Sequence, residues 1–171
     1  MSNKFVASIY PHSPYNLGST ESLVYGSIFV PEKLKLILDG MTTFLPLVFQ
    51  KHNVATNEVT LVGRGFSGAV VIPTLAANLG CKMTLIRKEQ DDRHSANTQE
   101  GLSIGACGTP WIFVDDLIDT GHTRQSVIDV VGYLPVASVL YGHNIAWKYQ
   151  DKQDLQPVYL LWKHVWRDYN V

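Results

Sequence analysis

Apolar residues recur along the chain at the spacings expected for helices and strands. From residue 31 onward they repeat at helical spacing, which predicts a helix that begins at Pro31, a favourable first helical residue. The apolar face of this helix consists of Leu34, Ile37, Leu38, Met41, Leu45 and Val48. Pro46 has no backbone N–H and should kink or shorten the helix. Residues 1–30, which proline and glycine interrupt, indicate irregular or short extended structure.

Short apolar runs then alternate with helix-compatible segments. The runs expected to form strands are residues 59–62, 83–86, 111–114, 136–141 and, with a covering segment, 158–166. One helix should end near Gly80, and another should span residues 123–133 with Val127, Val130 and Val131 facing the core. Strand–helix–strand units of this kind make parallel sheets. The pattern predicts an α/β fold with an open, mainly parallel sheet flanked by helices.

The polar segment at residues 88–105 is rich in charged residues, Ser, Asn, Gln and Gly. A structureless connection of this length is uncommon, and such loops are usually functional lids or mobile segments. We therefore expect a lid here.

Composition and charge narrow the class of protein. The chain of 171 residues suits a single domain, and its net charge of −1 without a basic stripe favours a small-molecule partner over nucleic acid. Cys81 and Cys107 indicate neither a zinc site nor a disulfide framework, which fits a reducing cytoplasm. No apolar stretch approaches the roughly 20 residues of a membrane span, and the chain start lacks the apolar stretch of a secretory signal.

Residues 111–123 carry the strongest indication of function. An apolar strand leads into Asp115 and Asp116, and after two apolar residues comes a small polar loop, Asp-Thr-Gly-His-Thr, that opens a helix. Backbone N–H groups, the hydroxyls of Thr120 and Thr123, and the helix dipole suit a phosphate. The two carboxylates suit ribose hydroxyls or a hydrated Mg²⁺ ion. A phosphorylated sugar is the predicted ligand, although an ordinary strand end followed by a capped turn is the alternative.

This segment resembles the phosphoribosyl-diphosphate motif of the type I phosphoribosyltransferases. The resemblance assigns the 5-phosphate to Asp119, Thr120, Gly121, His122 and Thr123. It assigns the ribose hydroxyls to Asp115 and Asp116, which would also hold Mg²⁺ directly or through water. His122 stands where the family often has Gly or Lys, so it should contribute mainly its backbone N–H.

Two further segments resemble parts of the same family. Arg64-Gly65-Phe66 is similar to the pyrophosphate loop of adenine phosphoribosyltransferases, with Gly63 in place of a serine, which implies that Arg64 and Gly65 bind pyrophosphate. Arg87 and Lys88 resemble a pair that stabilises the pyrophosphate just before a closing loop, in which Arg93 and His94 are further candidates. The alternatives are a surface arginine in a tight turn and a solvated Arg–Lys pair.

The implied reaction transfers ribose 5-phosphate from phosphoribosyl diphosphate to a base nitrogen and releases pyrophosphate, with Mg²⁺ as cofactor. Asp119, Arg87 and Lys88 are the implied catalytic residues. An acid at position 119 is typical of family members that act on 6-oxopurines, whereas the pyrophosphate loop is of the adenine type, so a purine-like base is expected. A hood formed by residues 1–30 and 142–171 would select the base. Its Trp147, Trp162 and Trp166 could stack on the base, but they suit the core or a dimer interface equally well.

Family analogy also implies a homodimer. Two alternatives to this transferase stay open. One is a regulator or sensor that binds phosphoribosyl diphosphate without significant turnover, and the other is hydrolysis of the donor or transfer to an unusual acceptor.

Overall fold

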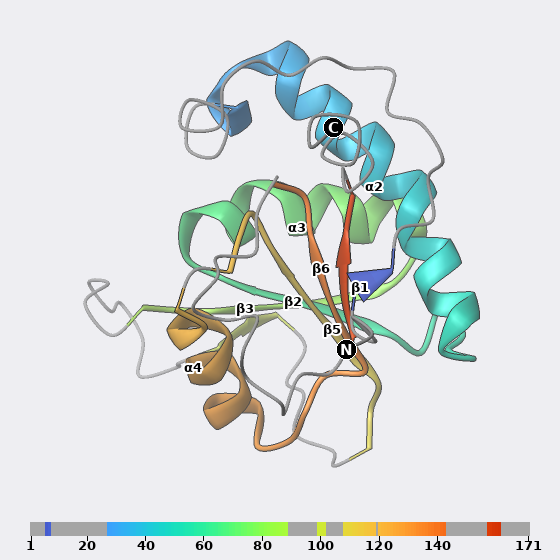
Figure 1. Ribbon diagram of the computed structural model, residues 1–171, viewed down its shortest axis with the longest axis vertical. Helices are drawn as coiled ribbons and strands as arrows, with labels where there is room; N and C mark the ends of the chain where they lie inside the picture. The colour runs from blue at the N-terminus through green and yellow to red at the C-terminus, as the bar shows by residue number, and fades with distance from the viewer. Residues whose placement is uncertain are drawn as a thin grey trace, which may run out of the picture.

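The computed structural model describes residues 6–7, 27–88, 99–101, 108–118, 120–142 and 157–161. Within these ranges seven strands form one sheet in the order β1-β7-β6-β5-β2-β3-β4 (Figure 1). The strands are β1 Val6–Ala7, β2 Thr60–Arg64, β3 Lys82–Ile86, β4 Gln99–Gly101, β5 Trp111–Asp115, β6 Ala137–Leu140 and β7 Val158–Leu160. All neighbours pair in parallel except β3 and β4. The predicted open, mainly parallel sheet is confirmed.

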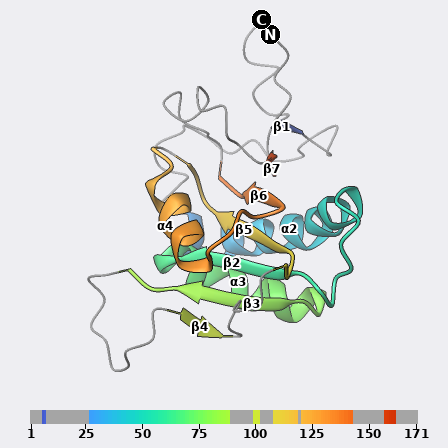
Figure 2. The same ribbon diagram turned by 90° about the horizontal axis from the view of Figure 1, so that it is seen from below.

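Helices cover both faces of this sheet (Figures 1 and 2). Helices α2 (Pro31–Lys51) and α3 (Gly65–Leu79) pack on one face, α4 (His122–Val131) packs on the other, and a short 3-10 turn, η1 (Ser27–Phe29), precedes α2. Side chains along each strand alternate between the two cores: Leu61, Ile112 and Val139 face α2 and α3, whereas Val62, Phe113 and Leu140 face α4. This alternation is the strand period of two that the apolar runs could not reveal, because both faces are buried.

Helix α2 begins at Pro31 as predicted but continues through Pro46 to Lys51, so the predicted shortening is wrong. Pro46 is exposed, while Phe44 and Leu45 before it and Val48 and Phe49 after it are buried. Packing on both sides of the proline holds the last turns in place, which offsets the missing backbone hydrogen bond.

The polar segment after β3 includes a strand that its sequence does not suggest. Strand β4 pairs antiparallel with β3, with Ile86 opposite Gln99 and Thr84 opposite Gly101. Gly101 has φ of +105°, and a Cβ there would lie 2.6 Å from the carbonyl oxygen of Met83, so only glycine lets β4 approach so closely. Residues 89–98 and 102–107, including Arg93 and His94, lie outside the described residues, and the lid stays a prediction.

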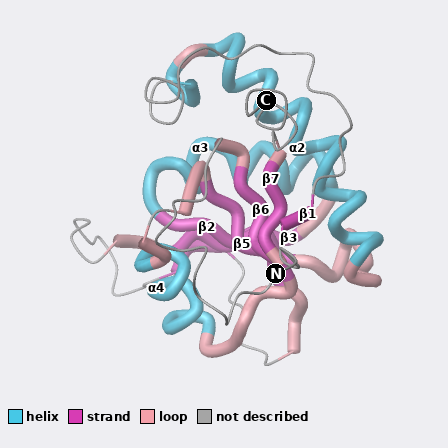
Figure 3. The backbone as a smooth tube through the Cα atoms, in the orientation of Figure 1, coloured by secondary structure: helices cyan, strands magenta, loops and turns pink. Residues whose placement is uncertain are grey.

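Two short strands come from the ranges expected to form a hood. Strand β1 pairs with β7, and β7 pairs with β6, so both extend one edge of the sheet (Figure 3). Trp147, Trp162 and Trp166 lie outside the described residues. Among the helices that the structure describes, none has the length and apolar character of a membrane span.

The connections of β2 and β5 open a crevice at one end of the sheet. These two strands are parallel neighbours, yet α3 leaves β2 over one face and α4 leaves β5 over the other. Ligands of open α/β sheets bind beyond the carboxyl ends of strands at such a divergence. Arg64 ends β2 and Asp115 ends β5, so both stand at this position.

Candidate active site

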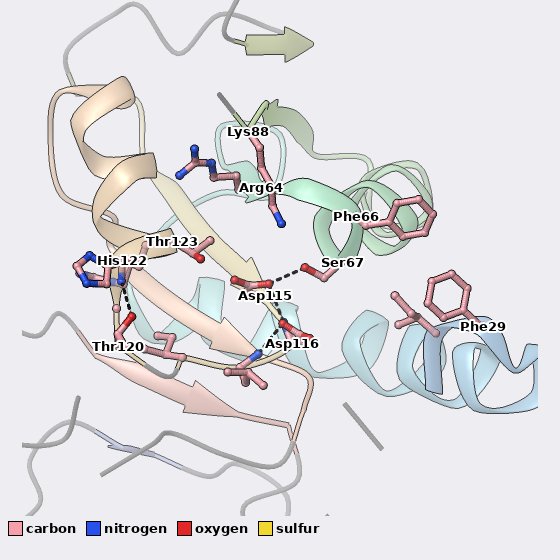
Figure 4. A pocket seen from close by; sticks show the side chains of 15 residues that line it. Phe29, Arg64, Phe66, Ser67, Lys88, Asp115, Asp116, Thr120, His122 and Thr123 are labelled. Atoms are coloured by element: carbon pink, nitrogen blue, oxygen red, sulfur yellow. Dashed lines mark hydrogen bonds between the residues drawn. The ribbon is translucent and has the colours of Figure 1, made fainter. Parts of the chain in front are cut away.

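A cavity of about 380 Å³ lies at the carboxyl ends of β2 and β5 (Figure 4). Its walls come from η1, the β2–α3 junction, the end of β3 and the loop between β5 and α4. They comprise Ile28, Phe29, Arg64, Phe66, Ser67, Lys88, Asp115, Asp116, Leu117, Ile118, Thr120, Gly121, His122, Thr123 and Arg124. The structure therefore brings the three sequence motifs together around one space.

Two basic side chains form one wall of the cavity. Arg64 is half-buried, and its Nε is buried without a hydrogen-bond partner among the described residues. The side chain of Lys88 lies across Gly65, where a Cβ would come within 2.6 Å of the lysine Cε. Gly65 also has φ of +65°, a backbone conformation that favours glycine, whereas the flexible Lys88 side chain could move aside. This wall offers positive charge and an unused donor to an anion.

Arg87 does not share this wall. Its guanidinium pairs with Glu100 of β4 at 2.5 Å, and it is not among the residues that line the cavity. Successive side chains of an extended chain point to opposite sides, so Lys88 reaches the cavity while Arg87 points away from it. A pyrophosphate or catalytic role for Arg87 stays a prediction that this placement does not support.

Asp115 stands at the centre of the site and is 4% exposed. Its Oδ1 accepts hydrogen bonds from the hydroxyl of Ser67 at 2.8 Å and from the backbone N–H of Asp116 at 3.0 Å. Burial, with the negative charge of Asp116 adding to it, raises the pKa of Asp115 to about 8, although the Ser67 hydroxyl acts in the opposite direction. Burial thus favours the protonated form of Asp115 more than in an exposed carboxyl group.

Asp116 is held by backbone contacts. Its Oδ1 accepts the N–H of Leu117 at 2.9 Å, and its carbonyl oxygen accepts the N–H of Gly142 at 2.8 Å. A Cβ on Gly142 would lie 2.2 Å from that carbonyl oxygen, so glycine after β6 is needed for Asp116 to sit where it does. Sequence reasoning missed Gly142, for which a glycine at the end of a predicted strand was the one available signal.

Residues 120–123 line another part of the cavity. Gly121, with φ of +82°, precedes α4, and the N–H of His122, the first residue of the helix, donates to the hydroxyl of Thr120 at 3.4 Å. The remaining N–H groups of the first turn suit an anion beside the Thr123 hydroxyl. The His122 ring lies on the outer side of the loop, away from Asp115 (Figure 4), which agrees with a contribution mainly from its backbone. Asp119 lies outside the described residues.

An aromatic pair that the sequence did not indicate borders the cavity. The rings of Phe29 and Phe66 have centroids 5.5 Å apart at an interplanar angle of 30°, and these side chains are 64% and 63% exposed. Phe29 lies in the N-terminal stretch that shows no periodicity, and Phe66 was notable only as part of the pyrophosphate loop. Large apolar side chains so exposed beside a polar cavity indicate a surface for an apolar or aromatic ligand group.

The acids present fit a magnesium ion that arrives with a substrate. Asp115 and Asp116 are the carboxylates that line the cavity, and no group of three or more His, Cys, Asp or Glu side chains among the described residues could hold a metal. Mg²⁺ is usually held by one or two carboxylates together with substrate phosphates and water. Among the described residues, the pair therefore fits a metal ion shared with substrate phosphates.

Comparison with known proteins gives matches in structure alone. No protein-family model matches the sequence, and no curated protein matches it either. The structure is similar to adenine phosphoribosyltransferase from Saccharomyces cerevisiae, with a TM-score of 0.59, 21% identity, and coverage of 79% of this chain and 82% of the yeast chain. Adenine phosphoribosyltransferase from Rhodothermus marinus gives a TM-score of 0.55 and 17% identity, with 91% of each chain covered.

Orotate phosphoribosyltransferase from Aeropyrum pernix is also similar, with a TM-score of 0.52, 16% identity, and coverage of 79% of this chain and 75% of that chain. At these identities the likeness concerns the fold, and it spans enzymes that act on different bases. The chain therefore has the type I phosphoribosyltransferase fold that its motifs predict.

Proposed function

We propose that this protein is a phosphoribosyltransferase that transfers ribose 5-phosphate from phosphoribosyl diphosphate to a nitrogen of a purine-like base and releases pyrophosphate. The observation that carries the proposal is the set of charges around one cavity. Arg64 and Lys88 supply positive charge, Asp115 and Asp116 supply carboxyl groups, and the loop at residues 120–123 supplies hydroxyl and N–H groups to the same space (Figure 4). This set suits the diphosphate, ribose and 5-phosphate of the donor.

Each part of the donor has a chemically suitable partner. The guanidinium of Arg64 suits the diphosphate, and the carboxylates of Asp115 and Asp116 accept hydrogen bonds from ribose hydroxyls. Thr120, Thr123 and the first turn of α4 suit the 5-phosphate. Structures of the relatives support this division: the yeast enzyme is complexed with an imino-altritol bisphosphate and adenine, and an enzyme from Trypanosoma brucei with AMP, pyrophosphate and ribose-5-phosphate.

Catalysis would come from positioning and charge stabilisation. As the bond to pyrophosphate breaks, negative charge grows on the leaving group and positive charge on the ribose ring. Arg64 and Lys88 stabilise the first, and the acids near the ring favour the second. Mg²⁺, held by Asp115 and Asp116 directly or through water, would neutralise the diphosphate further. Asp119 is proposed to contact or deprotonate the incoming base.

The Phe29–Phe66 pair offers the acceptor a surface for stacking. Both rings border the cavity on the side of Asp116 (Figure 4), where a base would have to lie to reach the anomeric carbon of a ribose held by the acids. Aromatic rings stack on any flat heterocycle. Stacking alone does not select adenine over an oxopurine, so the purine preference depends on the resemblance at Asp119.

Incubation with phosphoribosyl diphosphate, Mg²⁺ and a panel of bases, followed by measurement of pyrophosphate, tests the reaction. The double variant Asp115→Asn, Asp116→Asn is expected to lose donor binding while keeping its fold, and Asp129→Asn on the exposed face of α4 is the matched control. Donor binding without pyrophosphate release from any base would refute the transferase and favour the regulator. Unchanged affinity in the double variant would refute the ribose assignment. A cytoplasmic homodimer is proposed by family analogy, and sedimentation tests the dimer.

A further inference from the structure

Arg124 occupies a position in α4 where an apolar side chain would be expected. The buried residues of this helix are Arg124, Val127, Ile128 and Val131, which follow the spacing of a single helix face. Arg124 is 4% exposed, comparable to its apolar neighbours on the same face. A buried guanidinium needs partners for its hydrogen-bond donors and a counter-charge.

The described residues supply one hydrogen-bond partner and no ion-pair partner. Nε of Arg124 donates to the hydroxyl of Ser138 in β6 at 2.9 Å, but Nη2 is buried with no hydrogen-bond partner in the described part of the chain. Neither ion pair found in that part, Lys35–Asp39 or Arg87–Glu100, includes it. Since a guanidinium cannot lose its proton at ordinary pH, the charge stays and is strongly unfavourable unless an anion compensates it.

The position of Arg124 along α4 adds to this demand. It lies in the first turn of the helix, where the dipole is positive and a cation is disfavoured. It also lines the same cavity as Thr120, Gly121, His122 and Thr123. The carboxyl group of Asp115 in that cavity is engaged by Ser67 and by backbone. The helix end and the guanidinium therefore require an anion at the same wall of the cavity.

We propose that Arg124 completes the phosphate site and supplies the counter-charge for the sugar phosphate bound at the start of α4. Ser138 of β6 orients the guanidinium through its hydrogen bond with Nε. The consequence is selectivity: the site takes a sugar that carries a phosphate monoester and rejects the same sugar without it. This inference rests on the proposed function, because it assumes that the anion at this wall is the 5-phosphate of the donor.

Ribose 5-phosphate and pyrophosphate, the two halves of the donor, serve as separate probes of the folded chain. Arg124→Met keeps the unbranched apolar stem of the side chain without the charged guanidinium. Its affinity for ribose 5-phosphate should fall about 10- to 100-fold, the range for a hydrogen bond to a charged group, while its affinity for pyrophosphate is unchanged. The ligand-free variant should melt no lower than wild type, because an uncompensated buried charge has been removed.

A counter-ion elsewhere in the chain would give the opposite result. If a carboxylate outside the described residues pairs with Arg124, Arg124→Met lowers the melting temperature and leaves ribose 5-phosphate affinity unchanged, which overturns the proposal. Ser138→Ala gives a second measurement in a protein that keeps the guanidinium, and its affinity for ribose 5-phosphate should fall while that for pyrophosphate does not. No change in ribose 5-phosphate affinity in either variant also overturns the proposal.

Failure of this inference can be told apart from failure of the proposed function. A wild-type protein that releases pyrophosphate with a base, beside an Arg124→Met variant with normal ribose 5-phosphate affinity, refutes only the role of Arg124. A wild-type protein that binds neither phosphoribosyl diphosphate nor ribose 5-phosphate refutes both. Binding of inorganic phosphate that Arg124→Met abolishes, without any binding of phosphoribosyl diphosphate, refutes the proposed function and supports an anion site at Arg124.

Discussion

The hydroxyl of Ser67 donates a 2.8 Å hydrogen bond to Oδ1 of Asp115. This bond joins the first turn of α3, which follows the basic wall, to the end of β5, which carries the acids. The hydroxyl of Tyr141 in turn donates to the backbone carbonyl of Ser67 at 3.3 Å. The diphosphate and ribose parts of the proposed site are thus physically connected, and the ionisation of Asp115 depends on a residue of the other motif.

Removal of the Ser67 hydroxyl should weaken donor binding. Without this hydrogen bond the pKa of Asp115 rises further, so less of the carboxylate is ionised to accept ribose hydroxyls. We expect Ser67→Ala to lower phosphoribosyl diphosphate affinity about 3- to 10-fold at neutral pH and to move the rise of affinity with pH to higher values. Calorimetric titrations at several pH values measure both effects. Thr43→Ala, on the exposed face of α2, is the control, and an unshifted pH profile would contradict the prediction.

Asp115 should make the protein less stable as pH rises. The folded protein holds the proton of Asp115 up to about pH 8, whereas the ordinary pKa is 3.8, so the folded state binds more protons between these values. The contribution of Asp115 to the free energy of unfolding is therefore greatest at low pH and decreases as pH rises through this window. In Asp115→Asn this dependence is removed, and the variant should gain stability relative to wild type from about pH 4 to about pH 8. Urea denaturation across that range measures the difference, and parallel curves for the two proteins would rule out the assignment.

Variants of Lys88 and Arg87 form a matched pair that tests the basic wall. Lys88 lines the cavity, whereas Arg87 is paired with Glu100. Lys88→Ala should reduce pyrophosphate affinity about tenfold through loss of one charged contact, and Arg87→Ala should leave it nearly unchanged. Competition binding with pyrophosphate distinguishes the two. An equal loss in both variants would restore Arg87 to the site and imply that its pairing with Glu100 opens when ligand binds.

Gly63 stands where the pyrophosphate loops that this segment resembles have serine, and the structure shows why a side chain does not fit. A Cβ at this position would lie 2.5 Å from Cδ1 of Ile72 and 3.0 Å from the carbonyl oxygen of Val114. Gly63→Ser should lower the free energy of unfolding by about 1–3 kcal/mol, the usual effect of overpacking. Ala69→Ser, exposed on α3, adds the same hydroxyl without crowding and should change it by less than about 0.5 kcal/mol. Chemical denaturation measures the free energy of unfolding of each variant. Equal stability of the two variants would show that β2 can shift to make room.

Local sequence was sufficient for most elements and for the site motifs. Helix α3, which ends at Leu79 before Gly80, α4, and the strands that end at Arg64 and Asp115 all follow from apolar spacing and from turn residues that act over a few positions. For the same reason the phosphate loop and the acids could be recognised: their chemistry is contained in one continuous segment.

Pairings between distant segments could not be predicted in this way. The continuation of α2 through Pro46 depends on burial of its neighbours. Strand β4 depends on pairing with β3, thirteen or more positions earlier, and the polar sequence of β4 does not indicate this pairing. The turning of Arg87 toward Glu100 has the same origin. In each case a tertiary contact outweighs a local preference.

The sequence by itself determined the α/β class, the order of the elements and the residues of the proposed donor site, because periodicity and short motifs are local properties. Only the tertiary structure decided which side chains meet: Ser67 with Asp115, Phe29 with Phe66, and Arg124 with Ser138. These contacts join segments far apart in the chain, and their energies come from burial and charge, which are defined only once the sheet has brought those segments together.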